Sequence, residues 1–285
     1  MNLPITTAIK AAAKNASKAA SKNAISMRPA NFLHIAALFG TLALAPIFGK
    51  AQATAAQPSH VHNIILVHGA WADGSSWDKV IPLLEEKGFH VTAVHLPFTT
   101  LADDAATVKR ALALQDGPAL LVGHSYGGVV ITEAGDDPKV AGLVFVAAFA
   151  PDQGQSAADL ISQYPPAPGA KEFRPDANGF LKLTDQGIAE DFAQDLTPIE
   201  KQRLAATQGQ ASGPNEVGAK VTTVAWKHKP NFYIVTDQDR MIDPELEKKL
   251  AEQMHATTIH ISSSHVPMLS HPAQVADFIA TAAGK

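Results

Sequence analysis

The sequence of 285 residues contains no cysteine. Disulfide bridges and thiolate metal sites are therefore excluded, and an oxidising compartment is permitted but not required. Charged residues make up only 18% of the chain, whereas 46% of its residues are hydrophobic. A chain of this length and composition can bury one sizeable core, but it is too short for two α/β domains of ordinary size.

Acidic residues are absent from positions 1–53, which hold six lysines and arginines. An apolar run over 32–49 follows the basic region, and Ala51-Gln52-Ala53 supplies a small-x-small cleavage site. This order predicts a secretory signal peptide over 1–53, and hence a periplasmic or secreted protein. The alternative is a transmembrane anchor, but Pro46 within the run and the cleavage site after it favour removal of the segment.

Two further expectations concern this end of the chain. Met27-Arg28-Pro29 could itself begin a compact signal peptide, so a start at Met27 is an alternative to Met1. Cleavage after Ala53 removes 6 of the 23 basic residues and leaves 17 against 27 acids, a net charge of −10. Such a charge argues against nucleic acid or an anionic membrane as the partner. Residues 54–61 are expected to be a leader without core residues.

Continuous apolar runs alternate with segments of helical spacing between residues 62 and 151. Such runs are typical of strands that are buried on both faces of a parallel sheet. We expect strands at 62–67, 89–96, 119–122 and 140–148, with helices at 76–87, at 101–114 and after Ser125. This alternation of strands and helices predicts a doubly wound α/β fold with its ligands at the carboxyl ends of the strands.

The alternation of strands and helices is interrupted over residues 152–230, which carry several prolines. We interpret this stretch as a small helical lid with short helices at 156–163, 188–195 and 198–207. A separate small domain or a loose loop is the alternative, although the stretch is long for a loop without structure. The core then resumes over 231–285, with strands expected at 232–235 and 257–261 and helices at 244–254 and 272–283.

Gly123-His124-Ser125-Tyr126-Gly127-Gly128 follows the third expected strand and precedes a helix-compatible segment. A Gly-x-Ser-x-Gly between strand and helix is typical of a nucleophile elbow, whose sharp turn exposes the serine hydroxyl. The glycines are needed because side chains two residues before and after Ser125 would collide. An ordinary turn is the alternative interpretation of so short a pattern.

A serine hydroxyl needs a base to take its proton, and that base is usually a histidine held by a carboxylate. In this type of fold the three residues follow in the order Ser, acid, His, each after a strand. Ser125, Asp239 and His265 satisfy this order. Asp237 is the rival acid, and His271 is the rival base, although it is expected in the first turn of the last helix.

The transition state of acyl transfer needs two backbone N–H groups to hold its oxyanion. We expect these from Tyr126, directly after the nucleophile, and from Ala70 in the loop after the first strand. Trp71 is expected to line the substrate pocket. Among the other histidines, His68 is expected to shape the oxyanion loop and His124 to pack beneath the elbow.

Three further aromatic residues of the lid, Phe173, Phe180 and Phe192, are candidates for the pocket wall or for simple lid core. His60-Val61-His62 is taken as surface, because alternating histidines without a third ligand are a weak metal signal. No metal or cofactor is predicted.

Four motifs together resemble the α/β-hydrolase superfamily. They are His68-Gly69-Ala70-Trp71, Gly123-His124-Ser125-Tyr126-Gly127-Gly128, Asp237-Gln238-Asp239-Arg240 and Ser264-His265-Val266. Within the superfamily the chain resembles the branch of small bacterial esterases, plant methyl esterases and hydroxynitrile lyases. The resemblance covers residue 62 to the C-terminus, with the lid only loosely matched. It implies a cofactor-free Ser-His-Asp site beneath a small helical lid.

The resemblance leaves three functions to compare. The first is hydrolysis of a small ester through an acyl-enzyme. The second is cyanohydrin cleavage, but the lyases of this branch carry a threonine where this chain has Gly69 and a lysine where it has Val266. The third is ligand binding without catalysis, against which the intact Ser, Asp and His argue. The sequence favours the esterase.

Overall fold

Six parallel strands in the order β2-β1-β3-β4-β8-β9 form the central sheet of the computed structural model, which describes residues 61–285. The strands are β1 (Asn63–Val67), β2 (His90–Ala93), β3 (Ala119–His124), β4 (Val140–Val146), β8 (Asn231–Thr236) and β9 (Thr257–Ile261). Every residue of β1 and β3 is buried, as expected for strands covered on both faces. The predicted doubly wound α/β fold is confirmed.

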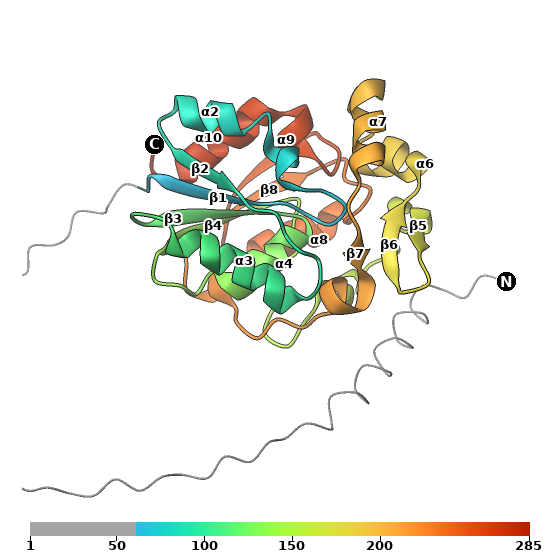
Figure 1. Ribbon diagram of the computed structural model, residues 1–285, viewed down its shortest axis with the longest axis horizontal. Helices are drawn as coiled ribbons and strands as arrows, with labels where there is room; N and C mark the ends of the chain where they lie inside the picture. Colours follow the sequence, from blue (N-terminus) through green and yellow to red (C-terminus); the bar gives the residue numbers. More distant parts are fainter. Residues whose placement is uncertain (1–60) are drawn as a thin grey trace, which may run out of the picture. The chain divides into compact units, whose positions relative to one another are not determined.

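Helices cover both faces of this sheet (Figure 1). One face carries α2 and α10, and the other carries α3, α4 and α8. The bounds of the core helices are η1 (Gly74–Trp77), α2 (Ile81–Glu86), α3 (Leu101–Ala113), α4 (Tyr126–Ala134), α8 (Pro244–Gln253), α9 (Pro267–Ser270) and α10 (Pro272–Ala282). The single helix predicted over 76–87 is wrong: η1 ends at Trp77, and α2 begins at Ile81 with Pro82 in its first turn, where the missing N–H costs nothing.

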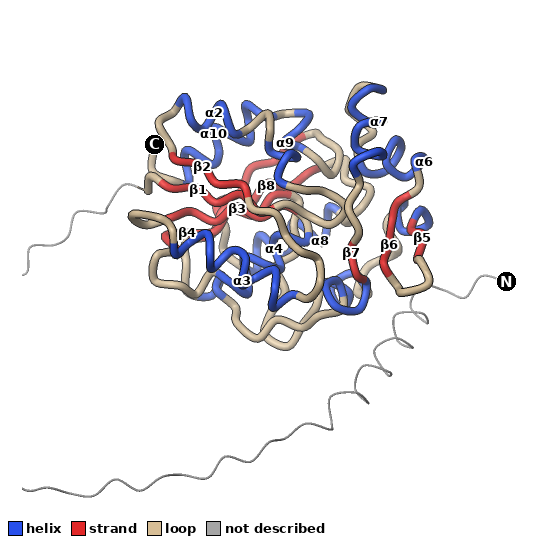
Figure 2. Tube along the Cα trace, viewed as in Figure 1, coloured by secondary structure: helices blue, strands red, loops and turns tan. Residues whose placement is uncertain are grey.

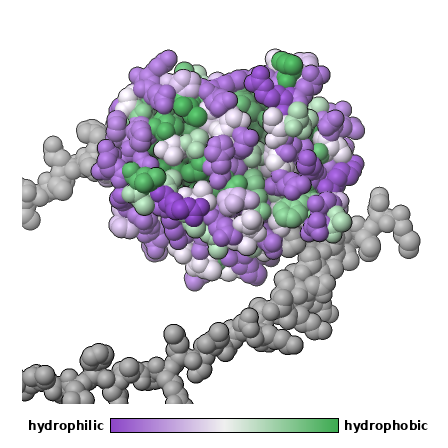
Figure 3. Space-filling view, in the orientation of Figure 1, coloured by the Kyte–Doolittle hydropathy of each residue, from purple (hydrophilic) through white to green (hydrophobic). Residues whose placement is uncertain are grey.

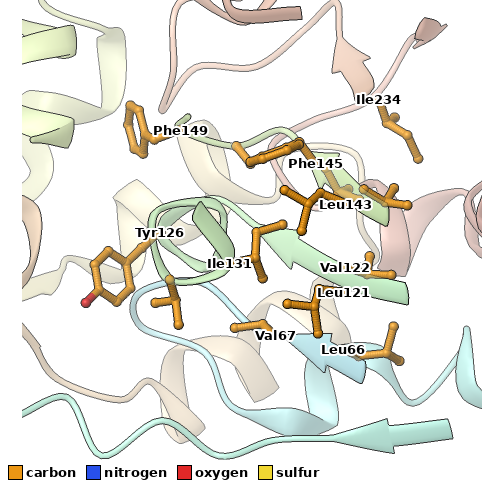
Figure 4. Close-up of a cluster of buried hydrophobic side chains, with 14 of the residues drawn as sticks. Leu66, Val67, Leu121, Val122, Tyr126, Ile131, Leu143, Phe145, Phe149 and Ile234 are labelled. Atoms are coloured by element: carbon orange, nitrogen blue, oxygen red, sulfur yellow. The ribbon is translucent and has the colours of Figure 1, made fainter. Parts of the chain in front are cut away.

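The core lies between the middle strands and α4 (Figure 4). Side chains of β3 and β4, including Leu121, Leu143 and Phe145, are completely buried there. A Cβ on Gly128 of α4 would lie 2.3 Å from the carbonyl oxygen of Phe149. The second glycine after Tyr126 therefore allows α4 to pack directly against the chain that leaves β4.

The lid, residues 152–230, contains more than the predicted short helices (Figure 2). Its helical segments are α5 (Ala157–Ile161), η2 (Pro168–Glu172), α6 (Asp185–Gly187), η3 (Ile188–Phe192), α7 (Pro198–Thr207), η4 (Gly213–Val217) and η5 (Ala225–Lys227). It also contains an antiparallel sheet of β5 (Phe173–Pro175), β6 (Phe180–Leu183) and β7 (Ala211–Ser212). The description of the lid as purely helical is therefore incomplete.

The unpredicted sheet forms because the chain reverses at Asp176-Ala177-Asn178-Gly179. The Asp176 carboxylate accepts hydrogen bonds from the backbone N–H groups of Asn178 and Phe180 at 2.8 and 2.9 Å. Gly179 has a φ of +86°, which glycine adopts without strain. An Asn-Gly pair is a hairpin signal in the sequence, but strands of two to four residues are too short for a periodicity argument.

The predicted signal peptide, residues 1–53, and all but the last residue of the predicted leader, 54–61, lie outside the described residues. Within residues 61–285, no helix is both long enough and apolar enough to cross a membrane. The face of the folded part shown in Figure 3 is mostly hydrophilic, with a few separate apolar patches.

Candidate active site

Ser125 occupies the turn between β3 and α4, in the order strand, turn and helix that the sequence predicts. Its φ and ψ are 53° and −118°, a conformation that few non-glycine residues adopt. A Cβ on Gly123 would lie 2.5 Å from the carbonyl oxygen of Gly127, and one on Gly127 would lie 2.5 Å from that of Val67. Both glycines flanking the strained serine are therefore required by backbone contacts.

Asp239 and His265 lie in the loops that follow β8 and β9, and they form a buried pair. Asp239 Oδ2 is 2.5 Å from His265 Nδ1, and Oδ1 accepts from the backbone N–H groups of Met241 and Ile242 at 2.6 and 2.9 Å. Burial favours a raised pKa for Asp239, but the adjacent imidazole and these hydrogen bonds outweigh burial, so the pKa lies below its ordinary value. The carboxylate is therefore ionised and oriented toward His265.

The rival residues are placed elsewhere. Asp237 lies 2.9 Å from the Nδ1 of His260 at the surface, where both side chains are exposed. His271 precedes α10, and its Nδ1 is 2.9 Å from the hydroxyl of Ser270. Of the two acids considered, Asp239 is thus the one that contacts His265.

His124 connects the elbow to the histidine loop. Its Nε2 donates to the backbone carbonyl of His265 at 2.8 Å, and the two rings are 4.7 Å apart. Burial, together with the neighbouring His265, holds the pKa of His124 well below its usual range, so this ring is neutral. Among the described residues, no hydrogen bond joins Ser125 Oγ to His265, a contact that is often long before substrate binds.

The two predicted oxyanion donors come from two different loops. Tyr126 directly follows Ser125 and is the first residue of α4, and two residues separate Ala70 from the end of β1. Neither backbone N–H donates to a protein group within residues 61–285. A Cβ on Gly69 would lie 2.8 Å from the Cβ of Ser125, so the loop that carries Ala70 passes directly over the serine. Both amides are therefore available to an acceptor outside the protein.

His68 holds this loop in place. Its Nε2 accepts from the backbone N–H of Leu96 at 3.0 Å, so its Nδ1 carries the proton and donates to the Gly69 carbonyl at 3.0 Å. Burial lowers the pKa of His68 to about 4, and the ring is neutral. The role predicted for His68 in shaping the oxyanion loop agrees with these contacts.

Aromatic side chains connect the lid to His265. The Trp71 Nε1 donates to the Leu181 carbonyl at 2.8 Å, and the indole stacks on Phe173 with ring centres 5.1 Å apart. The ring of Phe192 lies edge-on to both Trp71, at 6.5 Å, and His265, at 5.3 Å. Trp71, Phe173 and Phe192 therefore form one apolar group beside the imidazole, whereas Phe180 lies in β6 of the lid sheet.

Three polar residues of the lid hold the two loops that carry Asp239 and His265. Asp191 pairs with Arg240 at 2.7 Å, and the amide of Gln194 donates to the Gln238 carbonyl at 2.7 Å. Asp195 accepts from the backbone N–H of Ser264 at 3.0 Å. We call Asp191, Gln194 and Asp195 the lid clamp. Sequence reasoning missed it, because nothing local indicates which loops a lid residue will contact.

Several buried acids lie near the site, yet none forms a metal centre. Tyr126 Oη donates to Asp104 Oδ2 at 2.8 Å. Burial raises the pKa of Asp104, and it raises the pKa of Glu216 to about 8. In the part of the chain that the structure describes, no group of three histidines or acids is arranged to hold a metal ion.

The comparisons with known proteins agree on one family. The family model described as "Alpha/beta hydrolase family" matches residues 64–278. The chain is 26% identical over 248 residues to a pyrethroid hydrolase of Sphingobium wenxiniae, covering 77% of this chain and 87% of that protein. It is 25% identical over 251 residues to an α-hydroxynitrile lyase of Arabidopsis thaliana, covering 78% and 97%.

A solved structure, that of polyneuridine aldehyde esterase, superposes with a TM-score of 0.69. The two proteins share 23% identity, and the superposition covers 79% of this chain and all of the esterase chain, so the likeness concerns the fold. The family model extends from β1 into α10 and includes the elbow and both loops of the Asp239–His265 pair. The chain therefore belongs to the alpha/beta hydrolase family.

Proposed function

We propose that the protein is a serine hydrolase that cleaves small carboxylic esters through an acyl-enzyme. The observation that carries the proposal is the buried Asp239–His265 pair, which lies at the same end of the sheet as a strained serine and two free backbone N–H groups. A base, its orienting acid, a nucleophile and an oxyanion site are the complete set of groups that acyl transfer requires.

In the first half-reaction the Ser125 oxygen attacks the ester carbonyl carbon while the His265 Nε2 takes the hydroxyl proton. The carbonyl oxygen becomes an oxyanion between the amides of Ala70 and Tyr126. The C–O bond to the alcohol then breaks, and His265 gives its proton to the departing alcohol. Asp239 stabilises the imidazolium and accepts from the Nδ1 of His265, which leaves Nε2 for proton exchange with the substrate and Ser125.

In the second half-reaction a water molecule loses a proton to His265 and attacks the acyl carbon. Collapse of this intermediate breaks the bond to Ser125 and returns the proton to the serine oxygen. Loss of one oxyanion donor typically raises the barrier by about 3 kcal/mol. The similarity to a pyrethroid hydrolase supports hydrolysis as the reaction type.

Cyanohydrin cleavage is the second candidate, because the chain is also similar to an α-hydroxynitrile lyase. Two features of this chain argue against cyanohydrin cleavage. A Cβ at Gly69 would lie 2.8 Å from Ser125 Cβ and 2.9 Å from His124 Nδ1, so a threonine there would displace its neighbours. The position after His265 is Val266, which is buried and carries no ammonium group.

The test is hydrolysis of nitrophenyl acetate by the wild-type protein and its variants. We expect Ser125→Ala to lower kcat by about a millionfold, and Asp239→Asn by about ten-thousandfold, as in other triads. Asp237→Asn serves as the matched control and should retain near-wild-type activity. Equal, slow rates for wild type and Ser125→Ala would exclude the esterase, and cyanide release from a cyanohydrin would favour the lyase.

We also propose that the protein is exported and acts in the periplasm or outside the cell. The support is the basic, apolar and small-residue order of positions 1–53. Sequencing the amino terminus of the protein from the extracytoplasmic fraction should find Thr54 first. An intact amino terminus on cytoplasmic protein would contradict export.

A further inference from the structure

A second carboxyl group lies behind the Asp239–His265 pair and has no place in the mechanism above. Glu247, on α8, is completely buried. Its Oε2 accepts from the backbone N–H of Thr236 at 2.9 Å, and its Oε1 is 3.0 Å from the Thr236 hydroxyl. The same hydroxyl is 3.2 Å from Oδ2 of Asp239. One hydroxyl therefore lies between two carboxyl groups.

This arrangement requires that one of the two carboxyl groups carry a proton. A threonine hydroxyl has one hydrogen, so it cannot donate to two carboxylates at once. If Glu247 carries a proton on Oε1, it donates to the Thr236 oxygen, which donates in turn to Asp239. Every polar atom of the three side chains then has a partner, and the buried site holds one negative charge instead of two.

The remaining contacts show which acid holds the charge. Asp239 accepts from three N–H groups, those of His265, Met241 and Ile242, whereas Glu247 accepts from only one, that of Thr236. Hydrogen bonds from N–H groups favour the charged form of a carboxyl. The charge therefore belongs on Asp239.

The ionisable groups around Glu247 agree with this assignment. Burial and the charge of Asp239 raise the pKa of Glu247 well above its ordinary value. The other titratable neighbour is Tyr233 on β8, whose pKa is also raised by burial. Among the described residues, no lysine or arginine pairs with Glu247.

We propose that Glu247 is a positioning residue that stays protonated in the working enzyme and, through the Thr236 hydroxyl, fixes the Asp239 carboxylate against His265. The inference rests on the proposed function, because it concerns the acid of the same triad. A neutral Glu247 leaves the basicity of His265 to Asp239 alone. An ionised Glu247 would add a second negative charge and raise that basicity.

The first test measures kcat/KM against pH for the wild type and Glu247→Gln. Glutamine is neutral, and its amide can both donate to the Thr236 oxygen and accept from the Thr236 N–H. We expect kcat/KM within about twofold of wild type, with the midpoint of the acid limb unchanged. A midpoint lowered by about one pH unit would overturn the proposal, because it would mean that the substitution removed a charge near His265.

The second test removes the hydrogen-bond relay itself. Thr236→Val should lower kcat about tenfold at unchanged KM, since Asp239 then loses one bond that orients it. Glu247→Leu should lower kcat by a smaller factor, because the Thr236 hydroxyl can still donate to Asp239 but is no longer held by Glu247. Thr236→Val keeps both the shape of the side chain and the backbone N–H, so it serves if Glu247→Leu fails to fold. Wild-type kcat in a folded Thr236→Val protein would overturn the positioning role. Glu252→Gln, an exposed site on the same helix, is the matched control.

A third measurement does not depend on catalysis. The infrared spectrum at pH 7 should contain a protonated-carboxyl C=O band that is lost in Glu247→Gln, and the same loss is expected in a Ser125→Ala background. Absence of this difference would overturn the protonation of Glu247 whether or not the protein hydrolyses esters. Presence of the band in a protein without esterase activity would instead indicate that the proposed function is wrong.

Discussion

The sheet core and the lid are held by different kinds of interaction. Main-chain ladders join the six strands of the core, and the buried apolar faces of its helices cover them. At the end of the core that holds Asp239 and His265, the lid is joined by side-chain contacts, Trp71 to Leu181, Arg240 to Asp191 and the Ser264 backbone to Asp195. Within the described part of the chain, only two backbone hydrogen bonds accompany them there, from Gly169 to Arg240 and from Gly209 to Trp71. We therefore expect changes in the core to affect folding, and changes at the lid contacts to affect activity while the fold persists.

The difference between the core and the lid also explains why the residues of the proposed triad lie in the core. Ser125, Asp239 and His265 come from the core, where neighbouring strands fix the positions of the loops. The lid adds Phe192 against the His265 ring and the clamp on both loops. The core thus supplies all three residues of the proposed triad, and the lid contacts the loops of two of them.

The largest expected effect is in the core, at Gly127→Ala. The new Cβ would lie 2.5 Å from the Val67 carbonyl oxygen and 2.9 Å from that of His68, and neither backbone can move freely. We expect the free energy of unfolding to fall by about 3 kcal/mol, measured by urea denaturation. Gly117→Ala is the control, because its nearest neighbour would be 3.8 Å away. Equal stability of the two variants would contradict this account of the elbow.

A second effect of the core is a dependence of stability on pH. The pKa of His68 is about 4 in the folded protein and 6.5 in a solvent-exposed histidine. The unfolded chain therefore binds more protons between these values, so stability is greatest above pH 6.5 and falls as the pH drops toward 4. The loss amounts to about 3 kcal/mol at most.

Urea denaturation between pH 7.5 and pH 4 checks this dependence. The fall should be shallower in His68→Gln, which cannot be protonated. His124 contributes in the same direction, since burial also lowers its pKa. Parallel curves for wild type and His68→Gln would show that His68 is not the group responsible.

At the lid clamp we expect activity to change more than stability. Asp191→Asn removes a buried charge but keeps a side-chain oxygen of the same shape that can accept from the half-exposed Arg240, so the free energy of unfolding should change by only about 1 kcal/mol. A small displacement of the Asp239 loop should lower kcat/KM about tenfold. Parallel kinetic and thermal measurements on Asp185→Asn, at an exposed lid acid, provide the reference. A loss of stability without a loss of activity in Asp191→Asn would contradict the expectation that lid contacts serve activity more than folding.

The smallest expected effect is at the surface pair of Lys79 and Glu200, which joins the segment between η1 and α2 of the core to α7 of the lid at 2.5 Å. Both groups are solvated, so Lys79→Gln should change the free energy of unfolding by no more than about 0.5 kcal/mol. The difference should shrink further in high salt. A large drop in kcat would indicate that this contact, and not the clamp, controls the lid.

Much of the core was predictable because its signals are local. Apolar runs of four or more residues identified β1, β3, β4 and β8, and Gly123 and Gly127 identified the turn at Ser125. The strands β2 and β9 were also predicted, although polar residues interrupt both. Prediction failed where a single residue interrupts a pattern, as Pro82 does in the helix expected over 76–87. It also failed in the lid, where strands of two to four residues leave no periodicity to detect.

The sequence by itself determined the α/β class, the elbow and the order of Ser125, Asp239 and His265, because steric demands and hydrophobic periodicity act over a few residues. Only the tertiary structure decided that Asp239, and not Asp237, contacts His265, that Thr236 and Glu247 lie behind the pair, and that Asp191 and Asp195 hold its loops. These contacts depend on strand order and on how α8 and the lid pack against the sheet. No local pattern encodes them.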